Sequence, residues 1–450
     1  MRFLPITGLL ACAFAFAQNY YSVPPVDAPE LAARGKYSVG VRTVDIAHPG
    51  QPDILNFDKT TGKAPLYDRP LKIEVWYPAT IPAGKEEREV YTVPMPVAPG
   101  PSVPATFQLP GKALRDAPPV KGERYPLVVV SHGYPGSRTF MSWITENLAS
   151  RGYVVASIDH TDSVFGAVRA FTSTLLNRSS DQLFTIDAIS ALSKNADSFL
   201  NGIVDTANVA VIGYSMGGYG ALATAGAPYS KQGGSARIIP GGYFDAWTDG
   251  DPRFAAHDRS NIKALVAIAP WGNQPPNNNW DAHGLAQIRI PSMFIVGNQD
   301  DVSGYDSGVR KAFEGAVNSE RFMLVYENAR HNVGGNPPPP EAMGNFAALA
   351  FFEEPVWRKD RIAAINQHFI SAFLDLYLKH ADRLDYLMVP EKSDDLKWNP
   401  AQGQSPGAYS TGADAAGNPY WKGFQRRWAV GLEMKHYPAG QPASPSAPGR

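Results

Sequence analysis

NVAVIGYSMGGYGAL, residues 208–222, places a serine between a buried apolar strand and a run of small residues with helical character. Its centre, residues 213–217, fits the pattern Gly-x-Ser-x-Gly. In this pattern a sharp strand-to-helix turn exposes the serine, and the glycines let strand and helix approach closely. The pentapeptide alone is a weak signal, but here a strand comes directly before it and a helix directly after it. The stretch therefore predicts that Ser215 is a nucleophile.

Apolar strands alternate with helical segments on both sides of this stretch. Nearly continuous apolar strands are typical of a parallel sheet that is buried on both faces, because each crossover places a helix over the sheet. The predicted strands are 37–45, 71–78, 125–131, 153–158, 208–213, 262–269, 292–297 and 321–327, and the predicted helices are 141–151, 181–200 and 358–379. The fold class is thus α/β, with a mostly parallel central sheet and helices on both faces.

The alternating strands and helices are predicted to form one domain with insertions and extensions. Segments without a clear period and rich in proline or glycine mark the parts outside the core. The predicted parts are a lead-in at 18–36, a domain at 37–399 with insertions at about 79–123 and 224–261, a C-terminal extension at 400–438 with a possible strand where residues 428–434 alternate, and a disordered tail at 439–450. The insertion at 224–261 carries Tyr243, Phe244, Trp247 and Phe254. It is predicted to form a cap or rim; the alternative is a solvent loop unrelated to substrate.

Residues 1–17 (MRFLPITGLLACAFAFA) have the pattern of a secretory signal peptide: one arginine, an apolar stretch, and small residues at Ala15 and Ala17 before Gln18. Two alternatives are a buried first strand and a lipoprotein signal in which Cys12 is lipidated. Cys12 is the single cysteine of the chain, which excludes a disulfide framework and a multi-cysteine metal site. The sequence therefore predicts a secreted or periplasmic protein.

Composition excludes several classes of protein. The chain has 450 residues with 41 basic and 42 acidic side chains, a net charge of −1, so it lacks the basic footprint of a nucleic-acid binder. Hydrophobic residues make up 44% of the chain, which favours a globular protein. Beyond the first 17 residues no apolar run reaches the roughly 18 residues that a membrane span needs. The oligomeric state is not predicted.

A serine nucleophile needs an imidazole to take its proton and a carboxylate to orient the imidazole. Asp300 and Asp301 follow the predicted strand that ends at Gly297, and His331 follows the last apolar strand. Carboxyl ends of parallel strands meet at one edge of the sheet, where ligands bind. The chain order Ser, acid, His is thus present, with Asp300 and Asp301 both open as the acid.

The oxyanion of such a reaction is held by backbone amides, of which one belongs to the residue after the nucleophile, Met216. The second amide is expected in residues 132–136 (HGYPG), after the first strand of the series. Pro135 has no N–H, so Tyr134 is the better donor. His132 is interpreted as a structural residue under this loop.

Other polar clusters are weaker signals. Three acidic residues in the 224–261 insertion could hold calcium, but such loops are usually solvated and the EF-hand spacing is absent. These residues are Asp245, Asp249 and Asp251. At the end of the strand 153–158, the side chains of Asp159, His160 and Asp162 are expected to be structural hydrogen-bonding groups. No metal or other cofactor is expected.

Taken together, residues 125–136, 208–222, 264–304 and 321–335 resemble the α/β-hydrolase superfamily. The His-Gly-Tyr loop, the Ser-Met-Gly-Gly elbow and Ala269-Pro270-Trp271 resemble cutinases and polyester hydrolases. Residues 148–152 and 159–160 equally resemble platelet-activating factor acetylhydrolases and dienelactone hydrolases, although the latter use cysteine as nucleophile. The 224–261 insertion has no counterpart in a compact cutinase.

The resemblance implies a set of roles. Ser215, Asp300 and His331 would be the catalytic triad, Tyr134 and Met216 the oxyanion donors, and Tyr134 and Trp271 would contact substrate. The choice of Asp300 over Asp301 comes from the resemblance, because Asp300 precedes Val302 with Gly304 in the place of a family proline.

The expected function is that of a secreted serine carboxylic ester hydrolase that acts through an acyl-enzyme on a small-molecule, lipid or polymer ester. The alternatives are a lipid-ester hydrolase of the platelet-activating factor acetylhydrolase type, a lactone hydrolase, and a hydrolase-like binding module without catalysis.

Overall fold

The computed structural model describes residues 20–100, 103–393 and 420–442. The predicted signal peptide at 1–17, the first part of the C-terminal extension and most of the predicted tail lie outside the described residues.

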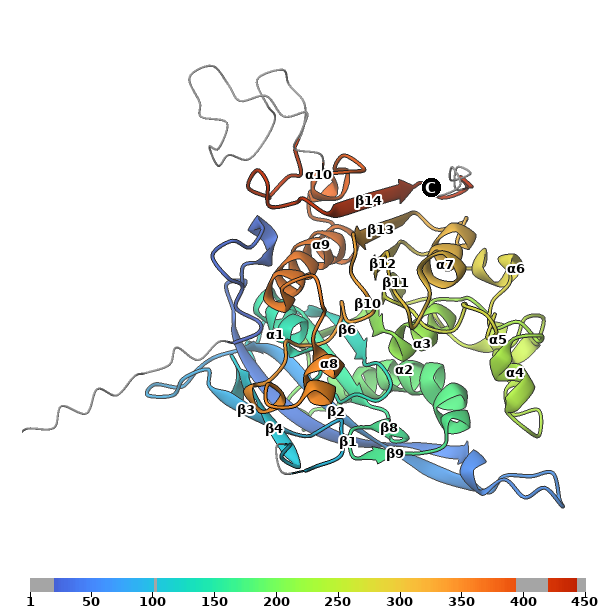
Figure 1. The fold of residues 1–450 in the computed structure, drawn as a ribbon. Coiled ribbons are helices and arrows are strands. Elements are labelled where there is room, and N and C mark those ends of the chain that lie inside the picture. Colours follow the sequence, from blue (N-terminus) through green and yellow to red (C-terminus); the bar gives the residue numbers. More distant parts are fainter. Residues whose placement is uncertain (1–19, 101–102, 394–419, 443–450) are drawn as a thin grey trace, which may run out of the picture.

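The described residues build a ten-stranded central sheet in the order β14-β13-β12-β11-β10-β6-β7-β2-β1-β5 (Figure 1). Six neighbouring strands of this sheet run parallel. They are β6 (Tyr125–Ser131), β7 (Val154–Asp159), β10 (Val204–Tyr214), β11 (Ile262–Ile268), β12 (Ser292–Gly297) and β13 (Arg321–Tyr326). The prediction of a mostly parallel α/β sheet is therefore confirmed.

The remaining strands extend the sheet at its two edges. The long strands β1 (Ser38–Pro52) and β2 (Leu66–Ala79) pair antiparallel, and β2 also pairs antiparallel with β7. The short strand β5 (Leu114–Arg115) ends this side. At the other edge β14 (Leu432–Tyr437) pairs antiparallel with β13.

Helices cover both faces of the sheet because its strands are apolar on both sides. In β6, Val128 and Val130 belong to one buried cluster and Leu127 and Val129 to the other. On the first face lie α1 (Ser142–Ser150) and α9 (Lys359–Lys379), and on the second lie α2 (Phe171–Lys194), α3 (Met216–Thr224) and α7 (Lys311–Gly315). Each buried aliphatic side chain contributes about 1.5 to 3 kcal/mol relative to exposure.

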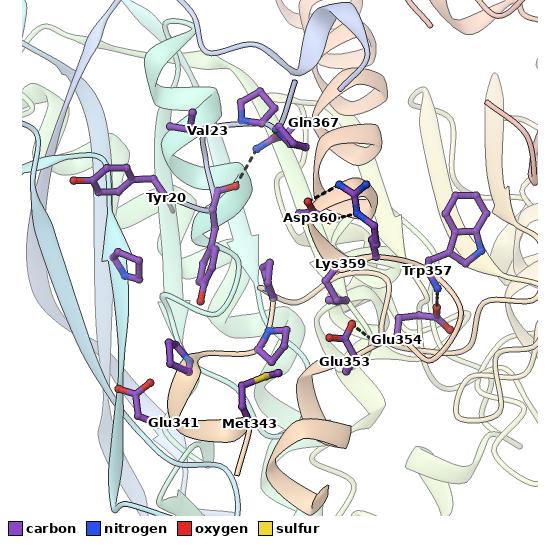
Figure 2. A pocket seen from close by; sticks show the side chains of 18 of the residues that line it. Tyr20, Val23, Glu341, Met343, Glu353, Glu354, Trp357, Lys359, Asp360 and Gln367 are labelled. Atoms are coloured by element: carbon purple, nitrogen blue, oxygen red, sulfur yellow. Dashed lines mark hydrogen bonds and ion pairs between the residues drawn. The ribbon is translucent and has the colours of Figure 1, made fainter. Parts of the chain in front are cut away.

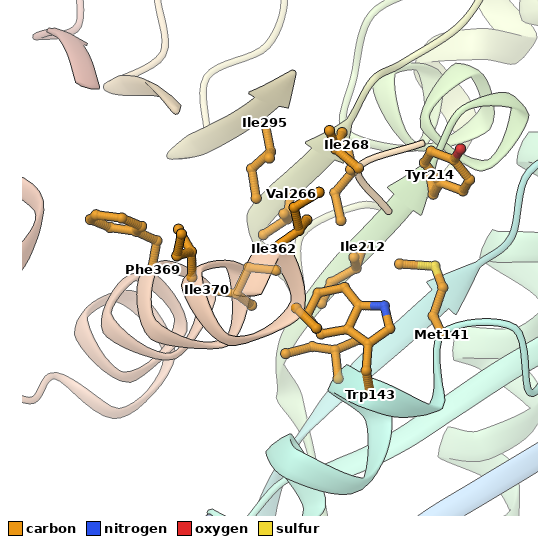
Figure 3. Close-up of a cluster of buried hydrophobic side chains, with 14 of the residues drawn as sticks. Met141, Trp143, Ile212, Tyr214, Val266, Ile268, Ile295, Ile362, Phe369 and Ile370 are labelled. Atoms are coloured by element: carbon orange, nitrogen blue, oxygen red, sulfur yellow. The ribbon is translucent and has the colours of Figure 1, made fainter. Parts of the chain in front are cut away.

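The first face shows how a helix closes the core. Figure 3 shows Ile362, Phe369 and Ile370 of α9 beside side chains of β10, β11 and β12. All three are at most 1% exposed. Their spacing puts them on one side of the helix, so α9 shields the sheet behind the strand ends that carry the site.

Parts of the predicted secondary structure differ from the structure. The predicted helix at 181–200 is α2, which begins ten residues earlier, at Phe171. Its first turns are rich in Ser, Thr and Asn, which are weak helix formers, and tertiary contacts override this local preference. The connection at 79–123 contains a hairpin of β3 (Glu89–Pro94) and β4 (Thr106–Gly111), in which Val93, Phe107 and Leu109 are buried.

The 224–261 insertion packs beside the second face. It contains α4 (Gly234–Ile238), η3 (Asp245–Trp247) and α5 (Pro252–Ala256). Phe244, Trp247 and Phe254 are at most 7% exposed, and the Phe244 ring lies 4.9 Å from that of Tyr229. These three aromatic residues therefore fill core, and the half-buried Tyr243 packs against it.

The C-terminal strand belongs to the main sheet. Of the four alternating residues at 428–434, only Leu432 and Met434 lie in β14, while Trp428 and Val430 belong to the preceding turn. The predicted boundary at 399 thus separates a strand from the sheet that it completes. The other short elements are η1 (Glu30–Ala32), η2 (Ile54–Asn56), β8 (Ser163–Val164), β9 (Ala167–Val168), α6 (Ala282–Leu285), η4 (Tyr305–Arg310), η5 (Pro340–Ala342), α8 (Phe346–Phe352) and α10 (Leu384–Leu387).

A buried ion-pair cluster joins β2 to α2 beneath the site. Arg69 donates to both oxygens of Asp181, at 2.8 and 3.0 Å, and to Asp162 at 2.5 Å. Burial raises the pKa of the Asp181 carboxyl, but Arg69 and His160 lower it by more, so that the net pKa is well below the usual value of an aspartate. The cluster therefore contains two carboxylates that depend on Arg69.

Replacement of Arg69 by Met is expected to lower the free energy of unfolding by about 3 to 5 kcal/mol, because it leaves buried carboxylates without their cation. Chemical denaturation measures the change. The matched control is Arg253→Met, which removes an equally bidentate pair with Asp251 at the exposed surface. Surface pairs contribute little, so equal effects of the two substitutions would contradict this prediction.

Candidate active site

Ser215 occupies the turn between β10 and α3 with φ 53° and ψ −114°. A non-glycine residue in this region is strained by about 1 to 3 kcal/mol, and such strain persists where the surroundings enforce it. The flanking glycines make the turn possible. A Cβ on Gly213 would lie 2.2 Å from the Gly217 oxygen, and one on Gly217 would lie 1.9 Å from the Ser131 oxygen. The turn therefore presents the Ser215 hydroxyl at the carboxyl end of the sheet.

His331 lies between Ser215 and Asp300. Its Nε2 is 2.9 Å from Ser215 Oγ, and its Nδ1 is 2.9 and 3.0 Å from the two oxygens of Asp300. The backbone N–H groups of Val302 and Ser303 donate to Asp300 Oδ1. A carboxylate accepts from Nδ1–H, so Nε2 is left to accept the serine proton. Sequence positions 215, 300 and 331 are thus brought into one hydrogen-bonded line.

Asp301 points elsewhere. It forms an ion pair with Arg330 at 2.7 Å, and both side chains are 53% exposed. Asp300 is only 5% exposed. The turn after β12 therefore directs one of the two neighbouring carboxylates at His331 and the other at solvent.

The two amides expected to hold an oxyanion flank Ser215. The backbone N–H groups of Tyr134 and Met216 donate no hydrogen bond to any group within residues 20–100, 103–393 and 420–442. Met216 is the first residue of α3, where helix N–H groups are free and the helix dipole favours negative charge. A Cβ on Gly133 would lie 3.3 Å from Ser215 Cβ, so the loop before Tyr134 passes close to the serine.

His132 fixes the orientation of this loop. Its Nδ1 donates to the Gly133 carbonyl at 2.7 Å, and its Nε2 accepts from the His160 N–H at 3.4 Å. Burial and the Arg178 cation hold the pKa of His132 well below its usual value, so the ring is neutral. Because the C=O and N–H of a trans peptide point in opposite directions, a fixed Gly133 carbonyl also fixes the Tyr134 N–H.

A second Ser–His–Asp line lies buried behind the first. His160 contacts Ser131 Oγ at 2.8 Å and Asp181 at 2.9 Å. All three are at most 2% exposed, and burial together with Arg178 lowers the pKa of His160 to about 3. Arg178 donates to the His132 carbonyl at 2.8 Å. These groups support the loop from within and do not reach solvent.

A cavity of about 580 Å³ opens over Ser215 and His331. Its volume lies in the range of small-molecule sites. It is lined by Gly133, Tyr134, Pro135, Phe140, Tyr214, Ser215, Asp301, Val302, Arg330, His331, Asn332, Phe346, Leu349, Ala350, Phe351, Glu353 and Pro355. Sequence reasoning missed the segment 346–355; its signal was the apolar run FAALAFF next to Glu-Glu-Pro.

Two predicted contributors lie outside this lining. The Trp271 ring packs against Phe171 and Tyr219, and the backbone N–H of Trp271 donates to the Ser215 carbonyl at 3.0 Å. Its backbone thus supports the elbow, while its side chain is not among the residues that line this cavity. No residue of the 224–261 insertion lines the cavity either, because its aromatic side chains are used in the core.

Within the described ranges, no group of three or more His, Cys, Asp or Glu side chains is arranged to hold a metal. Asp249 instead contacts His283 and Asp251 contacts Arg253. None of the helices in the described part of the chain is long and apolar enough to cross a membrane.

The chain is similar to several known proteins. The PET hydrolase-like (PETase) family model matches residues 117–240. Cutinase 2 of Thermobifida cellulosilytica is 25% identical over 215 residues, which cover 47% of this chain and 63% of that protein. Platelet-activating factor acetylhydrolase of Canis lupus familiaris is 48% identical over 50 residues, 11% of each chain. The match covers 51% of the length of a second relative, Cutinase cut1 of Thermobifida fusca. The chain therefore spans less than two thirds of the length of these curated cutinases.

A solved structure shares the fold over most of the chain. The ferulic acid esterase from Streptomyces cinnamoneus superposes with a TM-score of 0.50 and 19% identity, and the match covers 79% of this chain and 94% of that one. Family model, sequence relatives and solved structure agree: the chain has the α/β-hydrolase fold and is similar in sequence to cutinases.

Proposed function

We propose that the protein is a serine hydrolase of carboxylic esters. The observation that carries the proposal is the hydrogen-bonded line from Ser215 Oγ through His331 to Asp300, with the serine on a strained turn. The similarity to cutinases supports ester bonds as the target. Ser215 is the nucleophile, His331 the general base and acid, and Asp300 the group that orients the imidazole.

The proposed reaction has two steps. Ser215 Oγ attacks the ester carbonyl while His331 Nε2 takes its proton, and the oxyanion is bound by the N–H groups of Tyr134 and Met216. His331 then gives this proton to the leaving alcohol, and the acyl group stays on Ser215. Water attacks the acyl-enzyme with its proton passing to His331, and the carboxylic acid leaves as Ser215 regains a proton. The reaction consumes only ester and water.

A fluorophosphonate probe tests the proposal directly. Such a probe forms a covalent bond with an activated serine, and we expect one label per chain, located on Ser215 by peptide mass spectrometry. Labelling of the wild-type protein on no serine, or on a serine other than Ser215, would contradict the proposed role. Release of alcohol from a nitrophenyl ester by the same preparation links the label to ester turnover.

A lipid acetyl ester is the second candidate substrate. The partial match to a platelet-activating factor acetylhydrolase favours it. A comparison of nitrophenyl acetate with an acetylated lysophospholipid separates the two: a higher kcat/KM for the lipid would assign lipid hydrolysis. Export from the cytoplasm is also proposed, and it rests on the sequence of residues 1–17 alone.

Replacement of His132 by Phe is expected to lower kcat by about 10²-fold, the scale of losing one oxyanion donor, while KM changes less. The reason is that the Gly133 carbonyl, and with it the Tyr134 N–H, loses its fixed orientation. His132→Asn keeps an N–H donor near the place of Nδ1 and should retain more activity. Steady-state kinetics on a short ester measures both variants, and a wild-type kcat for His132→Phe would refute the positioning role.

A further inference from the structure

The apolar wall of the catalytic cavity comes from α8. Phe346, Leu349 and Phe351 line the cavity together with Phe140 and Tyr214. Apart from Ser215, His331 and the two tyrosines Tyr134 and Tyr214, the polar side chains of the lining are those of Asp301, Arg330, Asn332 and Glu353. Apolar lining with a few polar groups at one side is typical of sites that bury one apolar part of a ligand.

Hydrogen bonds anchor α8 to the loop that carries His331. The Asn332 side chain donates to the carbonyl of Ala350 at 3.1 Å and to that of Glu353 at 2.7 Å. In addition, the backbone N–H of Arg330 donates to the Glu354 carboxylate at 3.0 Å. Glu354 is 2% exposed, and bonds to a buried carboxylate are among the stronger ones. The wall is therefore held at a set distance from the imidazole.

Two further contacts hold the same segment. The Lys359 ammonium donates to the Asn332 backbone carbonyl. Burial lowers the pKa of Lys359 to about 8. The Phe351 ring packs 5.5 Å from Phe165 and 6.0 Å from Phe140. An aromatic contact of this kind adds about 0.5 to 1.5 kcal/mol beyond area burial. The wall is thus preformed.

A second cavity lies on the far side of the segment that follows α8. It has a volume of about 1210 Å³, and Figure 2 shows Glu353, Glu354, Trp357, Lys359 and Asp360 around it. Glu353 and Pro355 line both cavities. The anchored segment 353–355 therefore borders both cavities.

The catalytic cavity also has a charged side. The half-exposed pair of Asp301 and Arg330 adjoins His331, and His331 is the group that protonates the leaving alcohol in the proposed reaction. A polar product leaves more readily along a hydrated, charged rim than along an apolar wall. This difference in polarity favours the wall at α8 as the place of the acyl group.

We propose that α8 is the wall of an acyl pocket that limits the substrate to esters of compact apolar acids, and that Leu349 sets the length limit. This inference rests on the proposed ester hydrolysis at Ser215. An anchored wall beside the nucleophile leaves room for an acyl group that ends in the pocket, whereas a polymer chain continues past the scissile bond on both sides. Soluble esters are accordingly the substrates, and polyester chains are not.

The test is a nitrophenyl ester series from acetate through butanoate and octanoate to dodecanoate. For wild type we expect kcat/KM to be highest at acetate or butanoate and to fall at least about 10-fold by dodecanoate, because pocket size discriminates on this scale. Leu349→Ala should raise the dodecanoate-to-butanoate ratio about 10-fold. Leu384→Ala on α10, another partly exposed leucine remote from the lining, should leave the ratio unchanged.

Leu349→Trp provides the opposite change and protects the test against a variant that fails to fold. It should shift the preference towards acetate. Three results would overturn the acyl-pocket proposal. The first is wild-type hydrolysis of dodecanoate or of a polyester film as fast as that of butanoate. The others are unchanged ratios in both Leu349 variants, and a dependence of kcat/KM on alcohol size in place of acyl size. Fluorophosphonate labelling of Ser215 in the same preparations keeps this outcome distinct from a failure of the proposed function.

Discussion

Replacement of Ser215 by Ala is expected to lower kcat for a short nitrophenyl ester by a factor of about 10⁶, the scale seen when a serine nucleophile is removed from a triad. Alanine keeps the shape of the turn but has no oxygen to form the acyl-enzyme. His331 would then face an empty position 2.9 Å from its Nε2. Any residual turnover comes from the oxyanion donors and from substrate binding, which do not need the serine.

The change is measured by initial rates together with a thermal unfolding curve, which should show a folded variant because only one oxygen is lost. Ser131→Ala is the matched control. Ser131 is the serine of the buried line with His160 and Asp181, and it is fully buried. A Ser131→Ala protein should still be labelled by a fluorophosphonate. Ordinary esterase activity in Ser215→Ala would end the proposal of a serine mechanism at this site.

Asp300→Asn is expected to reduce kcat by a factor of about 10⁴, because an amide in this position favours the wrong imidazole tautomer. The Asp300 oxygens lie 2.9 and 3.0 Å from His331 Nδ1 and accept a hydrogen bond from its N–H. An asparagine NH₂ group placed there would donate to Nδ1, which moves the ring proton to Nε2. The ring could then no longer accept the proton of Ser215.

The neighbouring carboxylate supplies the control for this substitution. Asp301→Asn changes the same residue type one position later, where the side chain is half-exposed and pairs with Arg330. We expect its kcat to stay within about 10-fold of wild type, since an exposed pair contributes little. Measured kcat values in the reverse order would move the acid role to Asp301.

Much of the site could be predicted from local sequence patterns. Residues 208–222 combine strand, turn and helix within one short segment, and the conformation of such a segment depends on neighbours that are close in sequence. The order of Ser215, a carboxylate and His331 follows from strand ends, because the carboxyl ends of parallel strands meet at one edge. The parallel sheet followed from the apolar strands for the same reason.

Other features depended on contacts between distant segments. The beginning of α2 at Phe171 is determined by buried polar partners of its first turns, such as Arg178 beneath His132, and not by helix propensity. Likewise β14 is a strand because it pairs with β13. Neither partner is visible in the local sequence.

The sequence by itself determined the fold class, the serine turn, and which histidine and which pair of aspartates accompany it, because all of these follow from short segments and from chain order. Only the tertiary structure decided that Asp300 and not Asp301 contacts His331, that the Trp271 side chain lies outside the cavity, and that α8 and not the 224–261 insertion forms its wall. The direction of a side chain at a turn, and the choice between filling core and lining a cavity, are determined by packing between segments far apart in the chain, and periodicity carries no information on either.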